Sequence, residues 1–293
     1  MVFPRHANNF RQGFQGVVRD LIRSAGPDLM LSPWGRLRHD PCAVNAISIP
    51  RALRAALLAA ALPLALLAGP AAAAPPTIED SMGQRMAACT VCHGKAGRAA
   101  PDGYYPRLAG KPAGYLYHQL LNFRDGRRHY GLMTQMVDLL SDDYLREIAE
   151  YFSALDLPYP APAPVTATPQ TLQRGQQLVQ QGDAARGLPA CAQCHGAALT
   201  GVAPNVPGLL GLPRDYLNGQ LGAWKTGERR AHGPDCMATI AKRLPDEDVA
   251  AVSGWLAAQP LPPQAKAVAT APAWPAAAEA MPCGSAPELG AAR

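Results

Sequence analysis

Residues 89–94 read Cys-Thr-Val-Cys-His-Gly, and residues 191–196 read Cys-Ala-Gln-Cys-His-Gly. Two thiols at this spacing can each form a thioether to one vinyl group of a haem, and the histidine that follows then lies beneath the iron. A lone Cys-x-x-Cys pair is also typical of a redox dithiol or of half a zinc site, but two copies with His and Gly attached favour haem. We therefore predict two covalently bound haem c groups. The thioether residues are Cys89, Cys92, Cys191 and Cys194, and the proximal iron ligands are His93 and His195.

The repetition extends well beyond these two motifs. The stretch Pro-Arg-Leu-Ala-Gly at residues 106–110 is matched by Pro-Gly-Leu-Leu-Gly at 207–211. Three segments with helical periodicity follow the same order in each half, over residues 78–88, 115–124 and 140–155 in the first and over 169–181, 216–225 and 244–259 in the second. A unit this long is a duplicated domain rather than a solenoid repeat. Because no segment alternates like a strand, we expect an all-α fold of two tandem domains.

The ends of the chain and the joint between the halves have a different composition from the repeats. Arg51 and Arg54 precede an apolar run that is almost pure Ala and Leu, and small residues follow it. This pattern predicts a secretory signal peptide that is cleaved near Ala72–Ala74, and hence a periplasmic protein. An uncleaved anchor is the alternative, although the run is shorter than the roughly 20 residues of a membrane span.

These differences predict six segments. Residues 1–48 are interpreted as an extension that comes from a start codon assigned too far upstream, and 49–74 as the signal peptide. Residues 75–155 form domain 1, 156–170 a Pro-rich linker, 171–259 domain 2, and 260–293 a Pro- and Ala-rich tail.

Charge argues against one class of partner. The chain holds 27 basic and 22 acidic residues, a formal net charge of +5. Residues 1–74 contain 8 Arg and 3 Asp, and subtracting these leaves 19 basic and 19 acidic residues in the remainder. The exported part therefore has no global field that would attract nucleic acid, and we expect no nucleic-acid partner.

Each predicted iron has a sixth ligand position. A methionine thioether there makes a six-coordinate electron carrier with a raised potential, whereas an open position allows ligand or peroxide chemistry. Met133 lies eight residues before Ser141, and Met237 lies eight residues before Pro245, the counterpart of Ser141 in the second half. We therefore predict Met133 and Met237 as iron ligands. Met136 has no match in the second half, and we interpret it as a core residue together with Met82 and Met86.

Further polar residues recur around the motifs. A carbonyl of Pro106 or Pro207, placed between the proximal histidine and the middle helix, could accept the histidine Nδ1–H and fix its tautomer. Tyr115, Tyr216 and the pairs Arg127-Arg128 and Arg229-Arg230 are candidates for contacts with haem propionates, with a solvated or helix-packing face as the alternative for Arg127 and Arg229. We interpret His118, His129 and His232, which have no matched partners, as surface residues.

Two cysteines remain in the exported part. In an oxidising compartment Cys236 and Cys283 are expected to form a disulfide, which would hold the tail beside the distal face of the second haem. The alternative is that Cys236 ligates the second iron as a thiolate. That ligand would lower the potential and indicate an enzyme, but Met237 fits the repeat and Cys236 does not.

At this point the chain resembles a known family, the diheme cytochromes c of the c-four type, a duplicated form of class I cytochrome c. The resemblance covers residues 77–259. It rests on both haem motifs, on residues 106–110, 133–136 (Met-Thr-Gln-Met), 140–142 (Leu-Ser-Asp) and 150–152 (Glu-Tyr-Phe), and on residues 187–191 (Gly-Leu-Pro-Ala-Cys), Met237 and Leu244. The tail, the two spare cysteines and Pro245 in place of the usual Ser depart from the family pattern.

The resemblance implies two small class I cytochrome c folds packed about a pseudo-twofold axis, with haem propionates near one another. It also implies His–Met ligation of both irons and periplasmic electron delivery, often to a haem-copper terminal oxidase. We therefore expect an electron carrier rather than an enzyme, with no small-molecule substrate and with membrane contact only through a partner. The expected partners are a terminal oxidase, a quinol–cytochrome c reductase or a dehydrogenase, and a dehydrogenase could also hold the chain as its cytochrome subunit. The alternative is a diheme enzyme that resembles a thiosulfate dehydrogenase or a peroxidase, with Cys236 on haem 2.

Overall fold

The computed structural model describes residues 50, 79–100, 103–162, 164, 166–270 and 281–291. The predicted extension and, apart from residue 50, the predicted signal peptide lie outside the described residues. The chain divides into two units, Met1–Pro75 and Pro76–Arg293, and the description below concerns the described residues of the second. In the part of the chain that the structure describes, no helix has both the length and the apolar character needed to cross a membrane.

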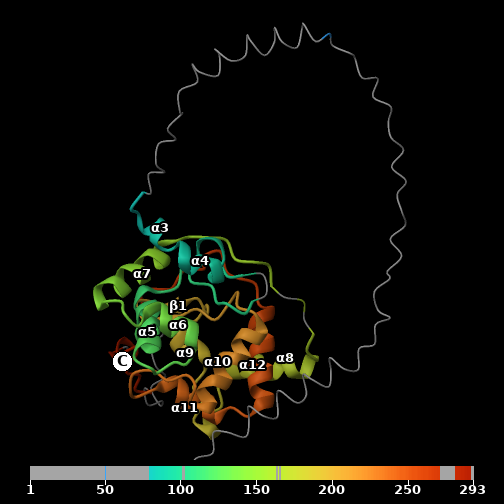
Figure 1. Cartoon of the computed structure of the whole chain (residues 1–293). Helices are drawn as coiled ribbons and strands as arrows, with labels where there is room; N and C mark the ends of the chain where they lie inside the picture. Colours follow the sequence, from blue (N-terminus) through green and yellow to red (C-terminus); the bar gives the residue numbers. More distant parts are fainter. Residues whose placement is uncertain are drawn as a thin grey trace, which may run out of the picture. The chain divides into compact units, whose positions relative to one another are not determined.

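Helices build the first half of this unit, in the order in which Figure 1 labels them. They are α3 (Met82–Arg85), α4 (Ala87–His93), the short 3-10 turn η1 (Lys95–Gly97), α5 (Ala113–Arg124), α6 (Gly131–Val137) and α7 (Asp142–Ala154). The Ser141 side chain accepts a 3.2 Å hydrogen bond from the Tyr144 N–H and so caps α7, while Asp142 and Asp143 oppose the helix dipole. The helix expected over residues 78–88 begins only at Met82, because Ser81 has an extended backbone and caps α3.

The second half repeats the arrangement. Its helices are α8 (Pro169–Gln180), the 3-10 turn η2 (Ala184–Arg186), α9 (Cys191–His195), α10 (Arg214–Thr226), α11 (Cys236–Arg243) and α12 (Asp246–Ala258). A Cβ at Gly175 would lie 2.2 Å from the Ala251 carbonyl oxygen, so glycine is what lets α8 pack closely on α12. Strands β1 (Gly201–Val202) and β2 (Val206–Pro207) form an antiparallel pair. With two residues each, they are too short to produce an alternating pattern, and the fold is helical as predicted.

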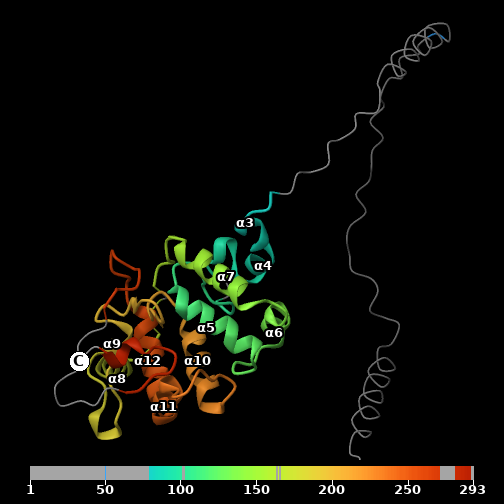
Figure 2. The same ribbon diagram turned by 90° about the vertical axis from the view of Figure 1, so that its left-hand side faces the viewer.

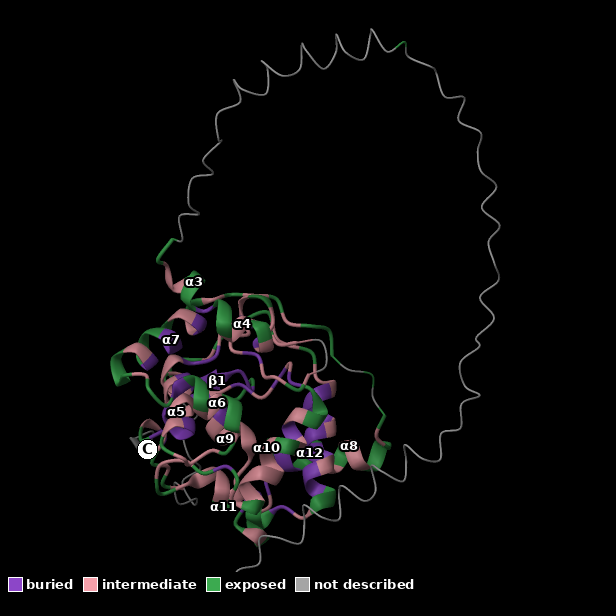
Figure 3. Cartoon of the chain, in the orientation of Figure 1, coloured by how far each residue is buried: buried purple, intermediate pink, exposed green. Residues whose placement is uncertain are grey.

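Each half has its own apolar core. Leu145, Ile148 and Phe152 of α7 pack with Met86 in the first core, and Met86 is only 2% exposed. Val252 and Leu256 of α12 are central to the second, in the helix that Figure 3 colours mostly as buried. The large apolar side chains thus sit on the closing helices, as their helical spacing predicted.

The tail packs onto the second half. Val268 pairs in parallel with Val202 of β1 through hydrogen bonds of 2.8 and 3.0 Å. Farther along, Leu289 of the short helix α13 (Glu288–Ala291) and Ala286, which precedes this helix, form a third apolar cluster with Val202 and Val206. Figure 2 shows this end of the chain beside α9. The tail therefore completes the wall of the second half.

Candidate haem sites

The four motif cysteines lie on α4 and α9, and none of them is in a disulfide. Burial raises the pKa of the Cys191 thiol to about 12 and that of Cys194 to about 11, and it also raises the pKa of Cys89. Redox dithiols and zinc sites need thiolates, which lowered pKa values favour. Within the described residues no group of three or more His, Cys, Asp or Glu side chains could hold a metal ion. All four thiols are free of disulfides, as covalent attachment to haem requires.

The histidine of each motif is buried and oriented by a proline carbonyl. His93 and His195 are each 7% exposed. The Nδ1–H of His93 donates to the Pro106 carbonyl oxygen at 2.8 Å, and that of His195 donates to the Pro207 carbonyl oxygen at 2.7 Å. A carbonyl can only accept, so the proton is on Nδ1 and the Nε2 lone pair is available to iron. The predicted role of the two prolines is confirmed.

Burial also keeps these imidazoles neutral. It lowers the pKa of both His93 and His195, although the proline carbonyls act in the opposite direction. Neutral imidazole is the form that binds a metal. Directly after His93, Gly94 has a φ of +73°, and a Cβ there would lie 2.2 Å from the Ala99 carbonyl oxygen. The glycine of the motif is therefore required by the turn that leaves the histidine facing inward.

One cavity of about 780 Å³ connects the two motifs. Its walls include all four cysteines and both proximal histidines, together with Met133 from α6 and Met237 from α11. Both predicted methionine ligands thus line the same cavity as the histidines. Met136 lines it too but is 48% exposed, so its interpretation as a core residue is wrong. The sequence could not reveal that α6 lies along the cavity wall instead of against the core.

Two arginines meet where the halves join. Arg128 and Arg229 form an antiparallel bridge, and Arg229 is only 4% exposed. Arg128 donates to the side-chain oxygens of Gln119 and Gln220 at 3.1 and 2.7 Å, and Arg229 donates to the same two oxygens at 2.9 and 2.7 Å. The solvated face offered as the alternative for Arg229 is wrong, because α5 and α10 meet over it.

Neither of these arginines has an acidic partner within the part of the chain that the structure describes. Both line the cavity, as do Tyr115 and Tyr216. Buried cations are normally paired with an anion. Haem propionates are carboxylates and would supply that negative charge. The hydrogen-bond donors of the two arginines therefore fit haem, the cofactor that the motif cysteines and histidines indicate.

Two further histidines lie at the joint and not on the surface. The rings of His118 and His232 meet edge to face with centroids 6.0 Å apart, and both residues are half-buried. The surface interpretation is therefore wrong for this pair, because α5 packs against the loop that follows α10. It is right for His129, which is exposed.

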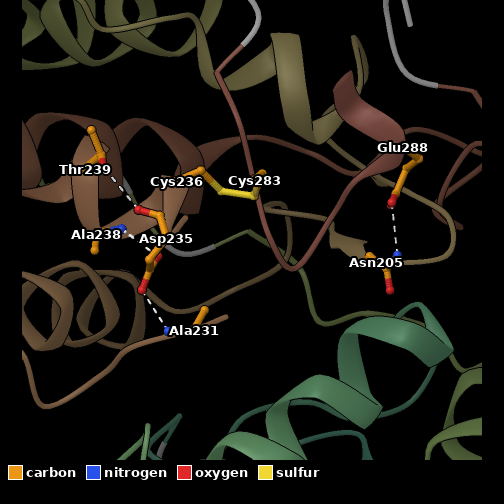
Figure 4. The surroundings of a disulfide bond; sticks show 8 residues. All are labelled: Asn205, Ala231, Asp235, Cys236, Ala238, Thr239, Cys283 and Glu288. Carbon is orange, nitrogen blue, oxygen red and sulfur yellow. Dashed lines mark hydrogen bonds between the residues drawn. A yellow bond between two sulfur atoms is a disulfide. The ribbon is translucent and has the colours of Figure 1, made fainter. Parts of the chain in front are cut away.

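Cys236 and Cys283 are joined by a disulfide, which Figure 4 shows at the start of α11. Asp235 caps this helix by accepting from the Ala238 N–H at 2.9 Å, and its other carboxylate oxygen accepts from the Ala231 N–H at 2.7 Å. A sulfur that is bonded to another sulfur cannot be a thiolate, so this arrangement is incompatible with Cys236 as a ligand of haem 2.

Beyond the disulfide, the tail also contributes to the cavity. Met281, Ser285, Ala286 and Leu289 all line it. Sequence reasoning missed these residues because the Pro- and Ala-rich composition around them is typical of a linker. The one local signal was Leu289, the last leucine of the tail, three residues after Ala286 at a helical spacing.

Two thiol pairs, each with a buried, carbonyl-oriented histidine, in two matching helical halves define a diheme c-type cytochrome. The sequence profile of the Cytochrome c family matches residues 172–259. A "thiosulfate dehydrogenase electron acceptor" from Thiomonas intermedia is 40% identical over 74% of this chain and 96% of its own length. A cytochrome c4 from Pseudomonas aeruginosa is 35% identical over 61% of this chain and 87% of its own length.

Solved structures agree with these relatives. Reduced cytochrome c4 from Pseudomonas stutzeri superposes with a TM-score of 0.52 at 30% identity, over 60% of this chain and 95% of that one. A thiosulfate dehydrogenase from Marichromatium purpuratum gives a TM-score of 0.53 at 33% identity over 59% of this chain, which spans only 36% of that structure's length.

The chain belongs to the cytochrome c4 family of diheme class I cytochromes c. It binds two haem c groups covalently and is an electron carrier. Each bound haem iron takes up and releases one electron.

Proposed function

We propose that this chain is a periplasmic carrier that accepts electrons from a thiosulfate-oxidising dehydrogenase and passes them towards a terminal oxidase. In this proposal Cys89 and Cys92 hold haem 1 and Cys191 and Cys194 hold haem 2. The iron ligands are His93 with Met133 in domain 1, residues 75–155, and His195 with Met237 in domain 2, residues 171–259. The predicted signal peptide supports export, because haem attachment of this kind takes place outside the cytoplasm.

One observation carries the proposal: the two histidine–methionine sets line a single cavity, and Arg128 and Arg229 bridge its two halves. Electron transfer between two sites needs them to be close and held in fixed positions. The hydrogen bonds that cross the joint supply the second requirement, since Arg128 bonds to Gln220 and Arg229 to Gln119. No acid or base is needed to move an electron, and the histidine Nδ1 protons remain engaged by proline carbonyls throughout.

The protein environment of each iron favours a carrier over an enzyme. A saturated His–Met pair leaves no site for a substrate, and the disulfide removes the thiolate that the enzyme alternative requires. Burial lowers the pKa of both histidines and so favours the neutral imidazole that binds a metal. The chain's own residues therefore keep the ligands fixed while the charge on the iron changes.

The choice of donor rests on the names of relatives. The Thiomonas protein is named as an electron acceptor of thiosulfate dehydrogenase, and the likeness covers nearly all of it. A second protein with that name, from Stutzerimonas stutzeri, is 35% identical over 78% of its length. The cytochrome c4 relatives support the more general role of an electron carrier, for which a quinol–cytochrome c reductase is the alternative donor.

The test is reduction of the purified diheme protein in a stopped-flow spectrometer. With catalytic amounts of a thiosulfate dehydrogenase and excess thiosulfate, we expect both haems to be reduced, and thiosulfate alone should reduce neither. Reduction by thiosulfate without the dehydrogenase would contradict the carrier role. Reduction only by a quinol–cytochrome c reductase would contradict the proposed donor.

Cyanide provides the second arm of the test. Two saturated His–Met sites should bind cyanide and carbon monoxide poorly. Tight binding of either at one haem would reveal an open or labile coordination site and favour the enzyme alternative.

A further inference from the structure

Lys111 lies between η1 and α5 in domain 1, yet its side chain serves domain 2. It is only 5% exposed, and its Nζ donates to the Gly208 carbonyl oxygen at 3.1 Å. Gly208 directly follows Pro207, whose carbonyl accepts the Nδ1–H of His195. Lys111, Gly208, Pro207 and His195 all line the cavity. A buried ammonium of one domain thus lies beside the proximal ligand of the other domain's haem.

This charge has no counter-anion. None of the ion pairs among the described residues includes Lys111. The charged group that acts on it most strongly is another cation, Arg107, whose guanidinium donates to the carbonyls of Leu157 and Pro158 and stacks on the Tyr159 ring. Burial lowers the pKa of Lys111 to about 8, which still leaves it protonated at neutral pH. A neutral polar residue could make the same hydrogen bond at a smaller desolvation cost.

The position in domain 2 that corresponds to Lys111 shows which side chain the fold accepts without this charge. Gly110-Lys111-Pro112 in domain 1 corresponds to Gly211-Leu212-Pro213 in domain 2. Leu212 is 9% exposed and belongs to the apolar core of domain 2. The turn and the following helix therefore need only an apolar side chain here. Lys111 therefore has no counterpart in domain 2. It acts on His195, whereas the cation that acts on His93 is Arg128 at the joint between the halves.

We propose that Lys111 is a positioning residue of domain 1 that raises the reduction potential of the haem in domain 2 and draws a shared electron towards that domain. Reduction lowers the charge of an iron centre by one, so a fixed positive charge nearby stabilises the reduced form more than the oxidised form. The step is transfer of one electron from haem 1 to haem 2. Haem 1 is oxidised, haem 2 is reduced, no bond forms or breaks, and no proton moves.

This inference rests on the two bound haems and not on the proposed donor, so it can be tested with the isolated protein. The experiment is a redox titration of the full-length holoprotein followed by NMR, in which haem methyl resonances report each domain separately. In Lys111→Gln we expect the equilibrium between the haems to shift about tenfold away from haem 2, equivalent to about 59 mV for a one-electron couple. Lys111→Leu, which copies Leu212, should give the same direction, and Lys111→Arg should stay near the native value.

The matched control is Lys225→Gln. Lys225 also donates to a backbone carbonyl, that of Leu244 at 2.9 Å, but it is paired with Asp246 and does not line the cavity. If both Lys111→Gln and Lys111→Leu leave the haem 2 potential where Lys225→Gln leaves it, the proposal is overturned. It is also overturned if the two haems shift equally, or if only the thermal stability changes. If Lys111→Leu fails to fold, the comparison between Lys111→Gln and Lys111→Arg is the test, because Gln retains a hydrogen-bond donor for the Gly208 carbonyl.

Discussion

Arg128 and Arg229 form a backbone bridge across the joint between the two domains, and each guanidinium donates to both Gln119 of α5 and Gln220 of α10. The arrangement is nearly symmetric, since Arg128 and Arg229 both come two residues after the matched glycines Gly126 and Gly227. Two like charges brought together in a buried place repel each other unless an anion lies between them. Propionates of the bound haems would supply such anions at this joint.

Replacing Arg229 with Met should destabilise the holoprotein by about 2 kcal/mol, because a buried network of charge-assisted hydrogen bonds loses its central donor. Chemical denaturation followed by haem absorbance measures this change. The control is Arg230→Met, whose side chain is exposed and reaches only the Gly126 carbonyl. Equal losses in the two variants would mean that the pair of Arg128 and Arg229 has no special role.

Replacing Met133 or Met237 with Ala should remove the signature of one methionine–iron bond from the near-infrared magnetic circular dichroism of the oxidised protein. The potential of that haem should fall, because the methionine sulfur stabilises the reduced iron. Met136→Ala is the control, since Met136 also lines the cavity but should leave both signatures intact. Loss of a signature in Met136→Ala, with Met133→Ala unaffected, would reassign the ligand of haem 1.

Replacing both Cys236 and Cys283 with Ser should lower the free energy of unfolding by up to roughly 4 kcal/mol, the chain-entropy value for a closed loop of 47 residues. The segment around Ala286 and Leu289 should then become sensitive to proteases, which mass spectrometry of the fragments would detect. The absorption spectrum should keep both His–Met signatures. A changed ligand signature at haem 2 would instead indicate that the Cys236 sulfur binds iron.

Replacing Asp248 with Asn should lower the free energy of unfolding by about 2 kcal/mol near neutral pH. This carboxylate is 4% exposed and accepts from Arg174 at 2.8 Å and from Arg186 at 2.7 Å. Asp246→Asn is the control in the same first turn of α12, and its exposed carboxylate should matter little. A comparable loss in the two variants would contradict the importance of the buried pair.

The Asp248 effect should also depend on pH. The hydrogen bond from Arg174 lowers the pKa of Asp248, and that from Arg186 acts in the same direction. The stabilisation is therefore present above the pKa of an unfolded Asp, about 3.9, and is lost as the pH falls through the lower value of the folded protein. Urea titrations should show the native and Asn variant stabilities converging below about pH 4. A constant difference down to pH 2 would show that the charge of Asp248 does not contribute.

The sequence predicted those parts of the site that depend on local spacing. The motifs at residues 89–94 and 191–196 led to two buried histidines that proline carbonyls orient. The preference of the repeat for Met133 over Met136 as an iron ligand stays a prediction. Pro106 and Pro207 were found from the repeat, because each lies between the proximal histidine and the middle helix, 13 residues after His93 and 12 after His195.

What the sequence could not supply is the contact between the two copies. Lys111 reads as an ordinary charged loop residue until the second domain covers it with Gly208. His118 and His232 are far apart along the chain and became neighbours only through packing. A pattern within one domain carries no information about the angle at which the other domain docks, so the two histidines were assigned to the surface.

In the proposed periplasmic location, the six cysteines from Cys89 to Cys283 have two opposite chemical requirements because of the disulfide between Cys236 and Cys283. Cys89, Cys92, Cys191 and Cys194 must remain thiols until they react with haem, whereas the last two must be oxidised. A chain exported from its N-terminus presents the four reactive thiols before either partner of the disulfide has emerged. Maturation in an oxidising environment therefore requires a reductant that keeps the Cys-x-x-Cys pairs open. In a host that lacks such a reductant, we expect this protein to accumulate without haem, its thiols paired with the wrong neighbours.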